Sequence, residues 1–211
     1  LGSTGSIGQN TLDVVSRHQD KYSIVALTAN TDVDALEQQC LQWRPEYAVM
    51  SEPSCAQQLF DRLKAAGLDT QVLAGGEGLS RVASLDQVDT VVAGIVGAAG
   101  LLPTLSAAES GKRVLLANKE ALVMSGHLFM RTAHANQADL LPVDSEHNAI
   151  FQCLPTRLDV YGRNGVARRD VFDQILREDG GHDGLGHVHE VNTDKIIPND
   201  RLSIKAGGLS P

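Results

Sequence analysis

The sequence predicts an α/β fold, a doubly wound parallel sheet followed by a truncated or irregular C-terminal segment. Two observations predict it. From Leu1 to about Leu154, short apolar or β-branched runs alternate with amphipathic stretches of helical period. At the start, a glycine-rich turn leads directly into one of these helical stretches. Right-handed crossovers between parallel strands place ligands at the carboxyl ends of the strands, so functional residues are expected there.

The expected strands are short, and several are continuous apolar runs, as is typical of parallel strands covered by helices on both faces. Because a glycine-rich turn of this kind normally follows a strand, we expect a first strand ahead of Leu1 that this chain lacks. We expect the strands present to cover residues 22–29, 47–50, 71–73, 90–93, 113–117 and 139–143.

Segments of helical period separate the strands. Asp32 and Ser54 are suited to cap the helices that follow them, since a short side-chain oxygen can accept a free backbone N–H. Residues 168–178 can form one more amphipathic helix, within a stretch that is otherwise irregular after about Pro155. We expect the helices of the sheet domain at residues 8–18, 33–43, 54–66, 101–110 and 122–136.

Composition narrows the class of protein. The 211 residues suffice for one α/β domain and a smaller appendage, and a net charge of −8 argues against a nucleic-acid partner. Cys40, Cys55 and Cys153 form no CxxC pair, which disfavours a disulfide framework or a zinc site and favours the cytoplasm. The chain has no run of about 18 apolar residues, so no membrane span is expected.

Three glycines at three-residue intervals, Gly2, Gly5 and Gly8, link the expected strand end to the first helix. Glycine allows positive φ and a close approach of the backbone to a pyrophosphate, and the helix N-terminus stabilises its negative charge. This spacing differs from the commoner Gly-x-Gly-x-x-Gly, and a turn without function is the alternative. The position at the head of a βαβ series favours dinucleotide binding.

The next strand end carries Asn30, Thr31 and Asp32, where dinucleotide enzymes often place a carboxylate for the ribose hydroxyls. Asn30 is uncharged and would tolerate a 2′-phosphate. For Asp32, the alternative to a role in cofactor binding is that it merely caps the following helix. No arginine or lysine stands nearby in the sequence. These residues therefore leave the choice between NADP and NAD open.

Two later strand ends are also candidates. The apolar run that begins at Val91 leads into the small residues at 97–100, which permit the close approach of a ring, although a plain glycine turn explains them equally well. Lys119 follows the strand at 113–117 and could hold an oxygen-rich substrate or merely keep a loop soluble.

Asp144 and Glu146 are two residues apart, so in an extended chain their carboxylates point the same way. Such a pair suits Mg²⁺ or Mn²⁺, and the alternative is a solvated loop that caps the next helix. A second group of potential ligands lies in a glycine-rich, weakly patterned segment and is not expected to bind metal. Its members are His182, Asp183, His187, His189 and Glu190.

Four motifs in order resemble the 1-deoxy-D-xylulose 5-phosphate reductoisomerase family: GSTGSIG at 2–8, IVGAAGL at 95–101, ANKE at 117–120 and PVDSEHNAIF at 142–151. The resemblance implies a Rossmann-like NADPH-binding domain at 1–143 and the start of the metal- and substrate-binding domain at 144–155. Residues 156–211 would be an unmatched tail. It also implies that the cofactor contacts Thr4, Gly5, Ser6, Ile7, Asn30, Thr31, Asp32, Asn118 and Glu120.

By the same resemblance, Asp144 and Glu146 would bind Mn²⁺ or Mg²⁺, while Lys119, Ser145 and Glu146 would contact the substrate. Lys119, Asp144 and Glu146 would then be the catalytic residues. The implied reaction, an isoprenoid-precursor step, rearranges 1-deoxy-D-xylulose 5-phosphate and reduces it with NADPH to 2-C-methyl-D-erythritol 4-phosphate. A homodimer is possible, in the cytoplasm or, for a plant-type source, in a plastid.

The resemblance also implies what is missing. Members of the family continue with a glycine-rich Ser-Gly-Gly-Pro region, a mobile lid, phosphate-binding residues and a further metal-binding glutamate. None of these is recognisable after about Val166, so we expect this chain alone to be catalytically impaired or inactive.

Two other functions compete with this one. The first is a dinucleotide-binding module without catalytic activity. The second is another oxidoreductase of the same fold, such as a semialdehyde dehydrogenase, which needs a nucleophilic cysteine. Cys153 lies in an expected helix without an activating partner, which disfavours that alternative.

Overall fold

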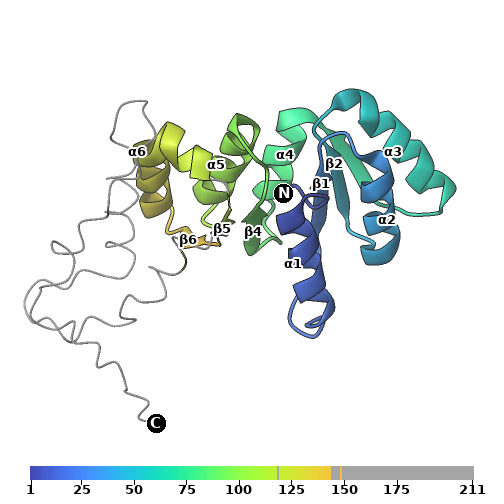
Figure 1. Cartoon of the computed structure of the whole chain (residues 1–211), viewed down its shortest axis with the longest axis horizontal. Coiled ribbons are helices and arrows are strands. Elements are labelled where there is room, and N and C mark those ends of the chain that lie inside the picture. Colours follow the sequence, from blue (N-terminus) through green and yellow to red (C-terminus); the bar gives the residue numbers. More distant parts are fainter. Residues whose placement is uncertain (118, 144–147, 149–211) are drawn as a thin grey trace, which may run out of the picture.

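The computed structural model describes residues 1–117, 119–143 and 148, and these form a layered α/β domain (Figure 1). Parallel strands alternate with helices along the chain. In order, the elements are α1 (Ser6–Ser16), β1 (Ala26–Ala29), α2 (Val33–Trp43), β2 (Tyr47–Met50), α3 (Pro53–Ala65), β3 (Gln71–Ala74), α4 (Gly75–Ala83), β4 (Thr90–Ala93), the 3₁₀ turn η1 (Ala98–Gly100), α5 (Leu101–Glu109), β5 (Arg113–Leu116), α6 (Lys119–Ala135) and β6 (Asp139–Pro142). The predicted α/β class with parallel strands is confirmed.

The strands form two three-stranded parallel sheets, ordered β1-β2-β3 and β4-β5-β6. The first residues of the chain lie between β1 and β4 and connect the two sheets. The Leu1 amino group donates to the Val92 carbonyl at 2.8 Å, and the Gly94 N–H donates to the Leu1 carbonyl at 3.1 Å. On the other side the Ser3 N–H donates to the Thr28 carbonyl at 2.7 Å. A strand leading into Leu1 would lie between the two sheets and complete one continuous sheet.

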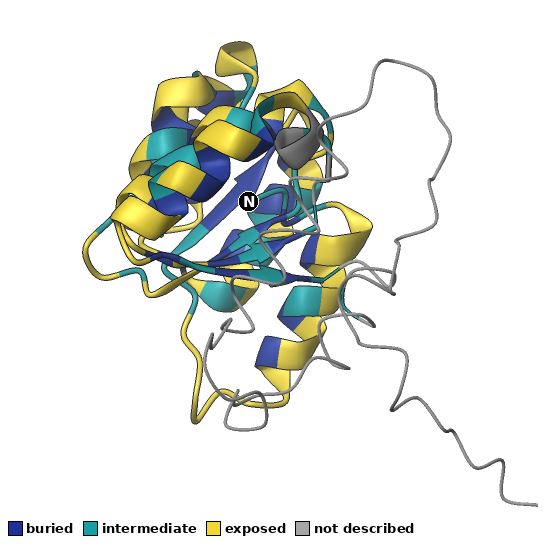
Figure 2. Ribbon diagram, turned by 90° about the vertical axis from the view of Figure 1, so that its left-hand side faces the viewer, coloured by how far each residue is buried: buried dark blue, intermediate teal, exposed yellow. Residues whose placement is uncertain are grey.

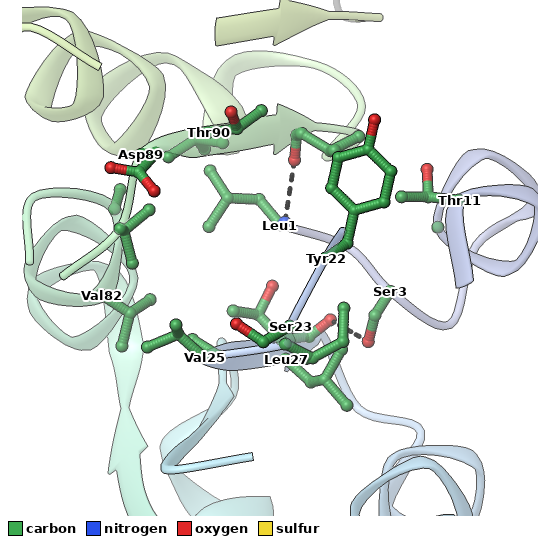
Figure 3. Close-up of a pocket in the computed structure, with 18 of the residues that line it drawn as sticks. Leu1, Ser3, Thr11, Tyr22, Ser23, Val25, Leu27, Val82, Asp89 and Thr90 are labelled. Carbon is green, nitrogen blue, oxygen red and sulfur yellow. Dashed lines mark hydrogen bonds between the residues drawn. The ribbon is translucent and has the colours of Figure 1, made fainter. Parts of the chain in front are cut away.

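That position is a cavity of about 240 Å³ (Figure 3). The apolar side chains of Val25, Leu27 and Val82 contribute to its wall, together with the polar Thr90 from β4. The cavity lies in the plane of the sheet, away from the carboxyl ends of the strands. It is therefore a gap in the sheet core and a poor candidate for the cofactor site.

Helices cover the sheet on both faces, and the alternation along β2 shows how. Ala48 and Met50 pack in a cluster with residues of α1, α2 and α3, whereas Tyr47 and Val49 pack with Leu79 and Val82 of α4. All four residues of β2 are buried, as expected for a central parallel strand. Figure 2 shows the buried residues gathered around the strands and the exposed ones on the outer sides of the helices.

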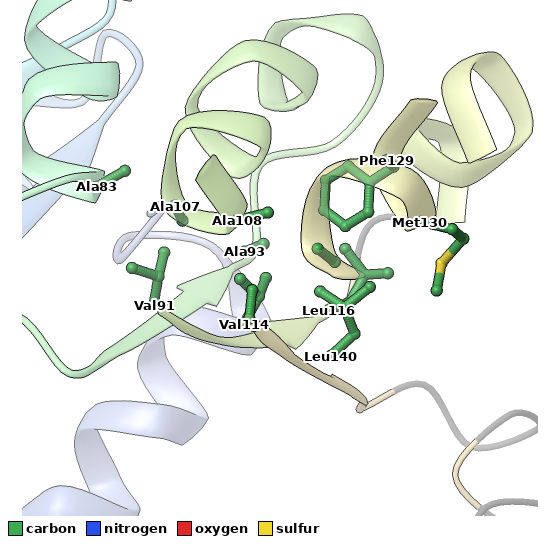
Figure 4. Packing of buried hydrophobic residues seen from close by; sticks show 12 residues of the cluster. Ala83, Val91, Ala93, Ala107, Ala108, Val114, Leu116, Phe129, Met130 and Leu140 are labelled. Carbon is green, nitrogen blue, oxygen red and sulfur yellow. The ribbon is translucent and has the colours of Figure 1, made fainter. Parts of the chain in front are cut away.

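The second sheet has its own core beneath α5 and α6 (Figure 4). Val114 and Leu116 of β5 and Val91 of β4 face Phe129 and other residues of these helices. Phe129 is fully buried and is among the largest side chains in the core. The two sheets are thus each stabilised by burial of apolar surface, the main favourable term in folding.

Helix α4 was not predicted from the sequence, because three glycines at its start resemble a turn. The helix forms because Leu79, Val82 and Ala83 bury one face against the sheet. Gly78 permits this packing, since a Cβ there would lie only 3.0 Å from Leu73 Cβ and Val49 Cγ1. Tertiary packing outweighs the low helix propensity of glycine here.

The helix cap predicted at Ser54 is wrong. Glu52 caps α3, with its carboxylate accepting the Ser54 N–H at 3.3 Å and the Ser54 hydroxyl at 3.0 Å. Pro53 occupies the first turn, where its missing N–H costs nothing. The helix therefore starts one residue earlier than predicted.

Other boundaries also differ from the prediction. Helix α1 covers Ser6–Ser16 and not 8–18, and several strands and helices differ by one residue at one end. Strand β1 begins at Ala26, four residues after the predicted start at Tyr22, which is exposed. Helix α6 begins at Lys119 and not at Leu122, and Ser125 interrupts it with non-helical φ −146° and ψ 24°. Lys119 and Glu120 therefore belong to the first turn of a helix.

Candidate cofactor-binding site

The glycine-rich segment folds as a tight turn. Gly2 has φ +74°, and a Cβ there would lie 3.0 Å from the Gly94 carbonyl oxygen of the loop after β4. Gly8 is buried in α1, and its Cβ would lie 2.5 Å from the Gly2 oxygen and closer still to Ser3 Cα. Both positions require glycine, because the atoms in the way are backbone atoms that cannot easily move.

The N-terminus of α1 has no side-chain cap. Gly5 is the N-cap residue, in extended conformation, and Gln9 is the first residue whose N–H bonds back along the helix, to the Gly5 carbonyl at 2.9 Å. The N–H groups of Ser6, Ile7 and Gly8 precede that bond. Unbonded N–H groups and the helix dipole together stabilise an anion at this end.

The predicted phosphate-binding residues lie at this end of α1. Thr4 is half-buried, while Gly5, Ser6 and Ile7 are exposed. A Cβ at Gly5 would have only the Gly2 oxygen as a neighbour, at 3.5 Å, so the backbone there is open to a ligand. The structure brings these four residues together on one accessible turn.

Two residues that the sequence did not reveal, Thr28 and Gln39, hold this turn in place. Thr28 of β1 accepts the Gly2 N–H on its hydroxyl at 2.7 Å and the Ser3 N–H on its carbonyl. Gln39 of α2 exchanges two hydrogen bonds with Ser3, one to its hydroxyl and one to its carbonyl. No local motif could have indicated this set, since Ser3, Thr28 and Gln39 are far apart in the sequence.

The end of β1 presents Asn30, Thr31 and Asp32, all exposed. The Asp32 carboxylate accepts the Ala35 N–H at 3.0 Å, so the predicted capping of α2 is confirmed. The Asn30 carbonyl accepts the Glu52 N–H at 3.1 Å, which ties this loop to the start of α3.

The loop after β4 runs beside the glycine-rich turn. Gly94 lies so close that a Cβ there would be 3.0 Å from the Leu1 oxygen and 3.5 Å from Ile7 Cγ2. Gly97 has φ 71° and ψ −162°, a conformation essentially restricted to glycine. Val96 is 79% exposed, which leaves an apolar side chain in solvent at the carboxyl edge of the sheet.

The ends of β5 and β6 lie at the same edge. The Ala117 N–H donates to the Ala93 carbonyl at 3.2 Å, and the Val143 N–H donates to the Leu116 carbonyl at 3.0 Å. Ala117 and Val143, the residues that follow β5 and β6, therefore lie at the same edge of the sheet. Glu120 is half-buried in the first turn of α6.

Several predicted site residues lie outside the described residues: Asn118, Asp144, Ser145 and Glu146, as do the histidines at 182, 187 and 189 with Asp183 and Glu190. For Lys119 the structure describes the backbone, in α6, but not the side chain. Within the described ranges no three His, Cys, Asp or Glu side chains are grouped to hold a metal ion. The metal-ligand role of Asp144 and Glu146 stays a prediction.

Neither cysteine in the described ranges is in a disulfide. Cys40 is buried in α2, and burial, with a smaller contribution from the negative charge of Glu37, raises the pKa of its thiol to about 12. A thiol with such a pKa is protonated at neutral pH and is a poor nucleophile. Cys40 is thus a core residue without a catalytic role.

The comparison with known families decides the relationship. Residues 1–126 match the family model described as 1-deoxy-D-xylulose 5-phosphate reductoisomerase. The chain belongs to the 1-deoxy-D-xylulose 5-phosphate reductoisomerase family. The motif resemblance in the sequence is thereby confirmed.

Curated relatives carry the same name. The reductoisomerase of Nitrosomonas europaea is 62% identical over 170 residues, covering 80% of this chain and 41% of the relative. That of Methylococcus capsulatus is 52% identical over 201 residues, covering 93% of this chain and 50% of the relative, so this alignment includes part of residues 156–211. The chain spans about two fifths to one half of the length of these relatives.

Solved reductoisomerases share the fold. A crystal structure of DOX-P reductoisomerase in complex with NADPH, fosmidomycin and magnesium superposes with a TM-score of 0.72 at 52% identity, covering 73% of this chain and 38% of that one. The enzyme from Zymomonas mobilis in complex with NADPH gives a TM-score of 0.69 at 44% identity, covering 73% and 40%. These matches confirm the Rossmann-like fold predicted from the sequence.

One further finding concerns membranes. Within the described part of the chain, no helix combines the length and the apolar character needed to cross a bilayer.

Proposed function

We propose that this chain is the NADPH-binding part of a reductoisomerase that converts 1-deoxy-D-xylulose 5-phosphate into 2-C-methyl-D-erythritol 4-phosphate. The observation that carries the proposal is the uncapped N-terminus of α1, reached through a turn in which Gly2 and Gly8 allow close backbone packing. Family membership supports the nature of the ligand, since relatives are solved with NADPH. The domain limits proposed are 1–143 for cofactor binding and 144–155 for the start of the catalytic part, with 156–211 beyond it.

The cofactor would extend along the carboxyl edge of the sheet. We assign its phosphates to the backbone N–H groups around Thr4, Gly5, Ser6 and Ile7, where the helix dipole offsets their charge. Asn30, Thr31 and Asp32 would border the adenosine, because they follow the neighbouring strand β1. Asn118 and Glu120 would border the cofactor from the segment after β5.

The substrate would be held next to the cofactor by residues that follow β5 and β6. Ala117 and Val143 lie at the same edge of the sheet, which supports placing Lys119, Asp144, Ser145 and Glu146 near one another. Asp144 and Glu146 supply the carboxylate oxygens that Mg²⁺ or Mn²⁺ prefers, and a bound ion would polarise the ketone and orient the substrate oxygens. Lys119 and Ser145 would bind substrate oxygens directly.

The partners and location follow from the same assignment. We propose a phosphorylated sugar as the substrate, a homodimer as the assembly and the cytoplasm as the compartment. The free thiols of Cys40 and Cys55 support a reducing environment. The net charge of −8 supports the absence of a nucleic-acid partner.

A second candidate is a dinucleotide-binding module without catalytic activity. The chain matches only 41% of the length of the Nitrosomonas europaea protein, which favours this candidate. A part of that size need not include all the residues that catalysis requires. We propose accordingly that this chain alone is impaired or inactive in catalysis. Oxidation of NADPH by the purified chain in the presence of substrate and Mn²⁺ would contradict this.

The test of cofactor binding is a fluorescence titration of the purified chain with NADPH, with and without Mn²⁺. We expect saturable binding that Gly5→Trp abolishes, because an indole at this open position would cover the N-terminus of α1. Gly76→Trp is the matched control, since Gly76 is exposed near the start of α4 with no atom within 4 Å of a Cβ. Asp144→Asn should change only the effect of Mn²⁺. Equal binding by wild type and Gly5→Trp would refute the assignment.

A further inference from the structure

Ser3 is the most firmly held residue of the glycine-rich turn. It is 5% exposed, although it lies in a loop. Its N–H donates to the Thr28 carbonyl at 2.7 Å, and its carbonyl accepts the Gln39 side-chain amide at 2.9 Å. Both ends of the residue are thus bonded, one to β1 and the other to α2.

The orientation of the Gln39 amide follows from simple accounting of donors and acceptors. The Ser3 carbonyl can only accept, so the group that faces it must be the Gln39 NH₂. The Gln39 oxygen then faces the Ser3 hydroxyl, at 2.6 Å. That hydroxyl has one proton and also lies 3.1 Å from the Thr28 carbonyl, so the shorter contact to Gln39 takes the proton.

We propose that Gln39 is a positioning residue for the cofactor phosphates, acting through Ser3. This rests on the proposed NADPH binding. By fixing the Ser3 carbonyl, Gln39 fixes the peptide plane between Ser3 and Thr4, and with it the direction of the Thr4 N–H. The turn then continues through Gly5, which has the largest conformational freedom, into the uncapped start of α1. A turn already fixed before binding loses less entropy when the ligand arrives.

The role is separable from the support of the fold. Helix α2 is anchored in the core by Val33, Leu36 and Cys40, which are buried, whereas Gln39 is only half-buried beside them. Removing its amide therefore takes away the contact with the turn and leaves the apolar packing of the helix. The neighbouring Gln38 is exposed on the same helix and provides a matched control.

The test is a double-mutant cycle on the full 211-residue chain with Ser3→Ala and Gln39→Leu, read by NADPH affinity. We expect each single change to weaken binding roughly three- to tenfold, as for loss of one or two ordinary hydrogen bonds. The double variant should bind no more weakly than Gln39→Leu alone, since Gln39→Leu already removes both bonds to Ser3, including the hydroxyl bond that Ser3→Ala breaks. Gln38→Leu should bind like wild type. Additive losses in the double variant would overturn the proposal.

Two further measurements separate positioning from general stability. Amide hydrogen exchange of the chain without ligand should become faster at Ser3 and Gly5, whose N–H groups are hydrogen-bonded in the turn, in Gln39→Leu, and remain unchanged in the strand β2. Adenosine 2′-monophosphate, which lacks the pyrophosphate, should bind wild type and Gln39→Leu equally. Faster exchange throughout the domain, or equal loss of affinity for both ligands, would show a merely structural role.

The proposal and the proposed function fail in different ways. If wild type does not bind NADPH, the proposed function fails, and exchange at the turn still decides whether Gln39 fixes it. If wild type binds and Gln39→Leu binds equally well, the positioning role is refuted. Should Gln39→Leu not fold, Gln39→Glu retains the acceptor for the Ser3 hydroxyl but loses the donor to the Ser3 carbonyl, and the same loosening of the turn is expected.

Discussion

Gly8 allows α1 to pack directly against the glycine-rich turn, because it has no side chain. A Cβ at this position would lie 2.5 Å from both the Gly2 and the Ser3 carbonyl oxygens, well inside van der Waals contact. The neighbours are backbone atoms that Thr28 and Gln39 already hold by hydrogen bonds. The turn therefore cannot move aside without breaking those bonds.

We expect Gly8→Ala to destabilise the chain by about 1–3 kcal/mol or more, as is usual when a well-packed site is overfilled. It should also weaken NADPH binding, because the displaced turn carries the N–H groups that we propose bind the phosphates. Urea unfolding followed by circular dichroism measures the first effect and the fluorescence titration the second.

Gly76→Ala is the control for the change of residue type. Gly76 also lies in a helix but has no atom within 4 Å of a Cβ. Alanine should stabilise the chain there by roughly 0.5–1 kcal/mol through its helix propensity. If both variants lose the same stability, the close packing at Gly8 is not the cause.

At this scale the sequence predicted the motif residues but not their supports. The spacing of Gly2, Gly5 and Gly8 is local and could be recognised directly. The contact between Ser3 and Gln39 depends on how α2 packs beside the turn, and no sequence pattern carries that information. Side-chain oxygens near helix starts gave one correct cap, Asp32, and one error, Ser54, because the longer Glu52 side chain also reaches the free N–H groups.

Among the elements, α2 begins with a cap residue that also belongs to the proposed cofactor site. The Asp32 carboxylate accepts the Ala35 N–H and so satisfies one of the free donors at the helix N-terminus. The same carboxylate is exposed in the loop proposed to border the adenosine. One side chain thus has a role in stability and a proposed role in binding.

Substitutions can separate the two roles. We expect Asp32→Ala to lower the free energy of unfolding by about 1 kcal/mol, the usual cost of losing such a cap. Asp32→Asn keeps an oxygen for the Ala35 N–H and should lie within a few tenths of a kcal/mol of wild type. Chemical denaturation of the three proteins measures this. If both variants lose the same free energy of unfolding, the negative charge of Asp32 stabilises the helix and its hydrogen bond to Ala35 does not.

The elements themselves could be predicted wherever apolar periodicity was strong. The bounds of β2, β4 and α2 agree with the predicted ranges, because each has a continuous apolar strand or a clear buried stripe. Helix α4 was missed because glycine lowers helix propensity, whereas the packing that overrides it, Gly78 against Leu73 and Val49, exists only in the folded chain.

In the molecule as a whole, the two half-sheets meet at Leu1. The Leu1 amino group bonds to Val92 in the cavity between β1 and β4, and burial lowers its pKa from 8.0 to about 6. An ammonium ion is costly in such surroundings, whereas a peptide N–H would make the same bond without charge. The alternation of strands and helices predicted the overall layering. It did not predict the hydrogen bonds by which the first residues of the chain connect the two sheets.

We expect stability to rise with pH between about 6 and 8. In this range the unfolded chain binds more protons at Leu1 than the folded chain does, because the folded pKa is the lower one. The contribution is fully present above pH 8 and lost below pH 6, and two pKa units correspond to roughly 2–3 kcal/mol. Urea unfolding at pH 6 and pH 8 measures it.

Acetylation of the N-terminus is the control. The acetylated nitrogen keeps an N–H for Val92 but no longer titrates, so the difference between pH 6 and pH 8 should shrink by the Leu1 contribution. Comparing acetylated with unmodified chain cancels the contribution of every other group in the protein. An unchanged difference would show that the Leu1 amino group is not buried in solution.

The backbone at Gly97 has a consequence for how this sequence can change over generations. Its φ of 71° and ψ of −162° exclude side chains by backbone conformation, although no atom lies within 4 Å of a Cβ there. Every amino-acid replacement reachable by one nucleotide change in a glycine codon introduces a Cβ. A lineage that depends on this loop can therefore replace the glycine only together with the shape of the loop, so amino-acid replacements are expected to accumulate around this position and not at it.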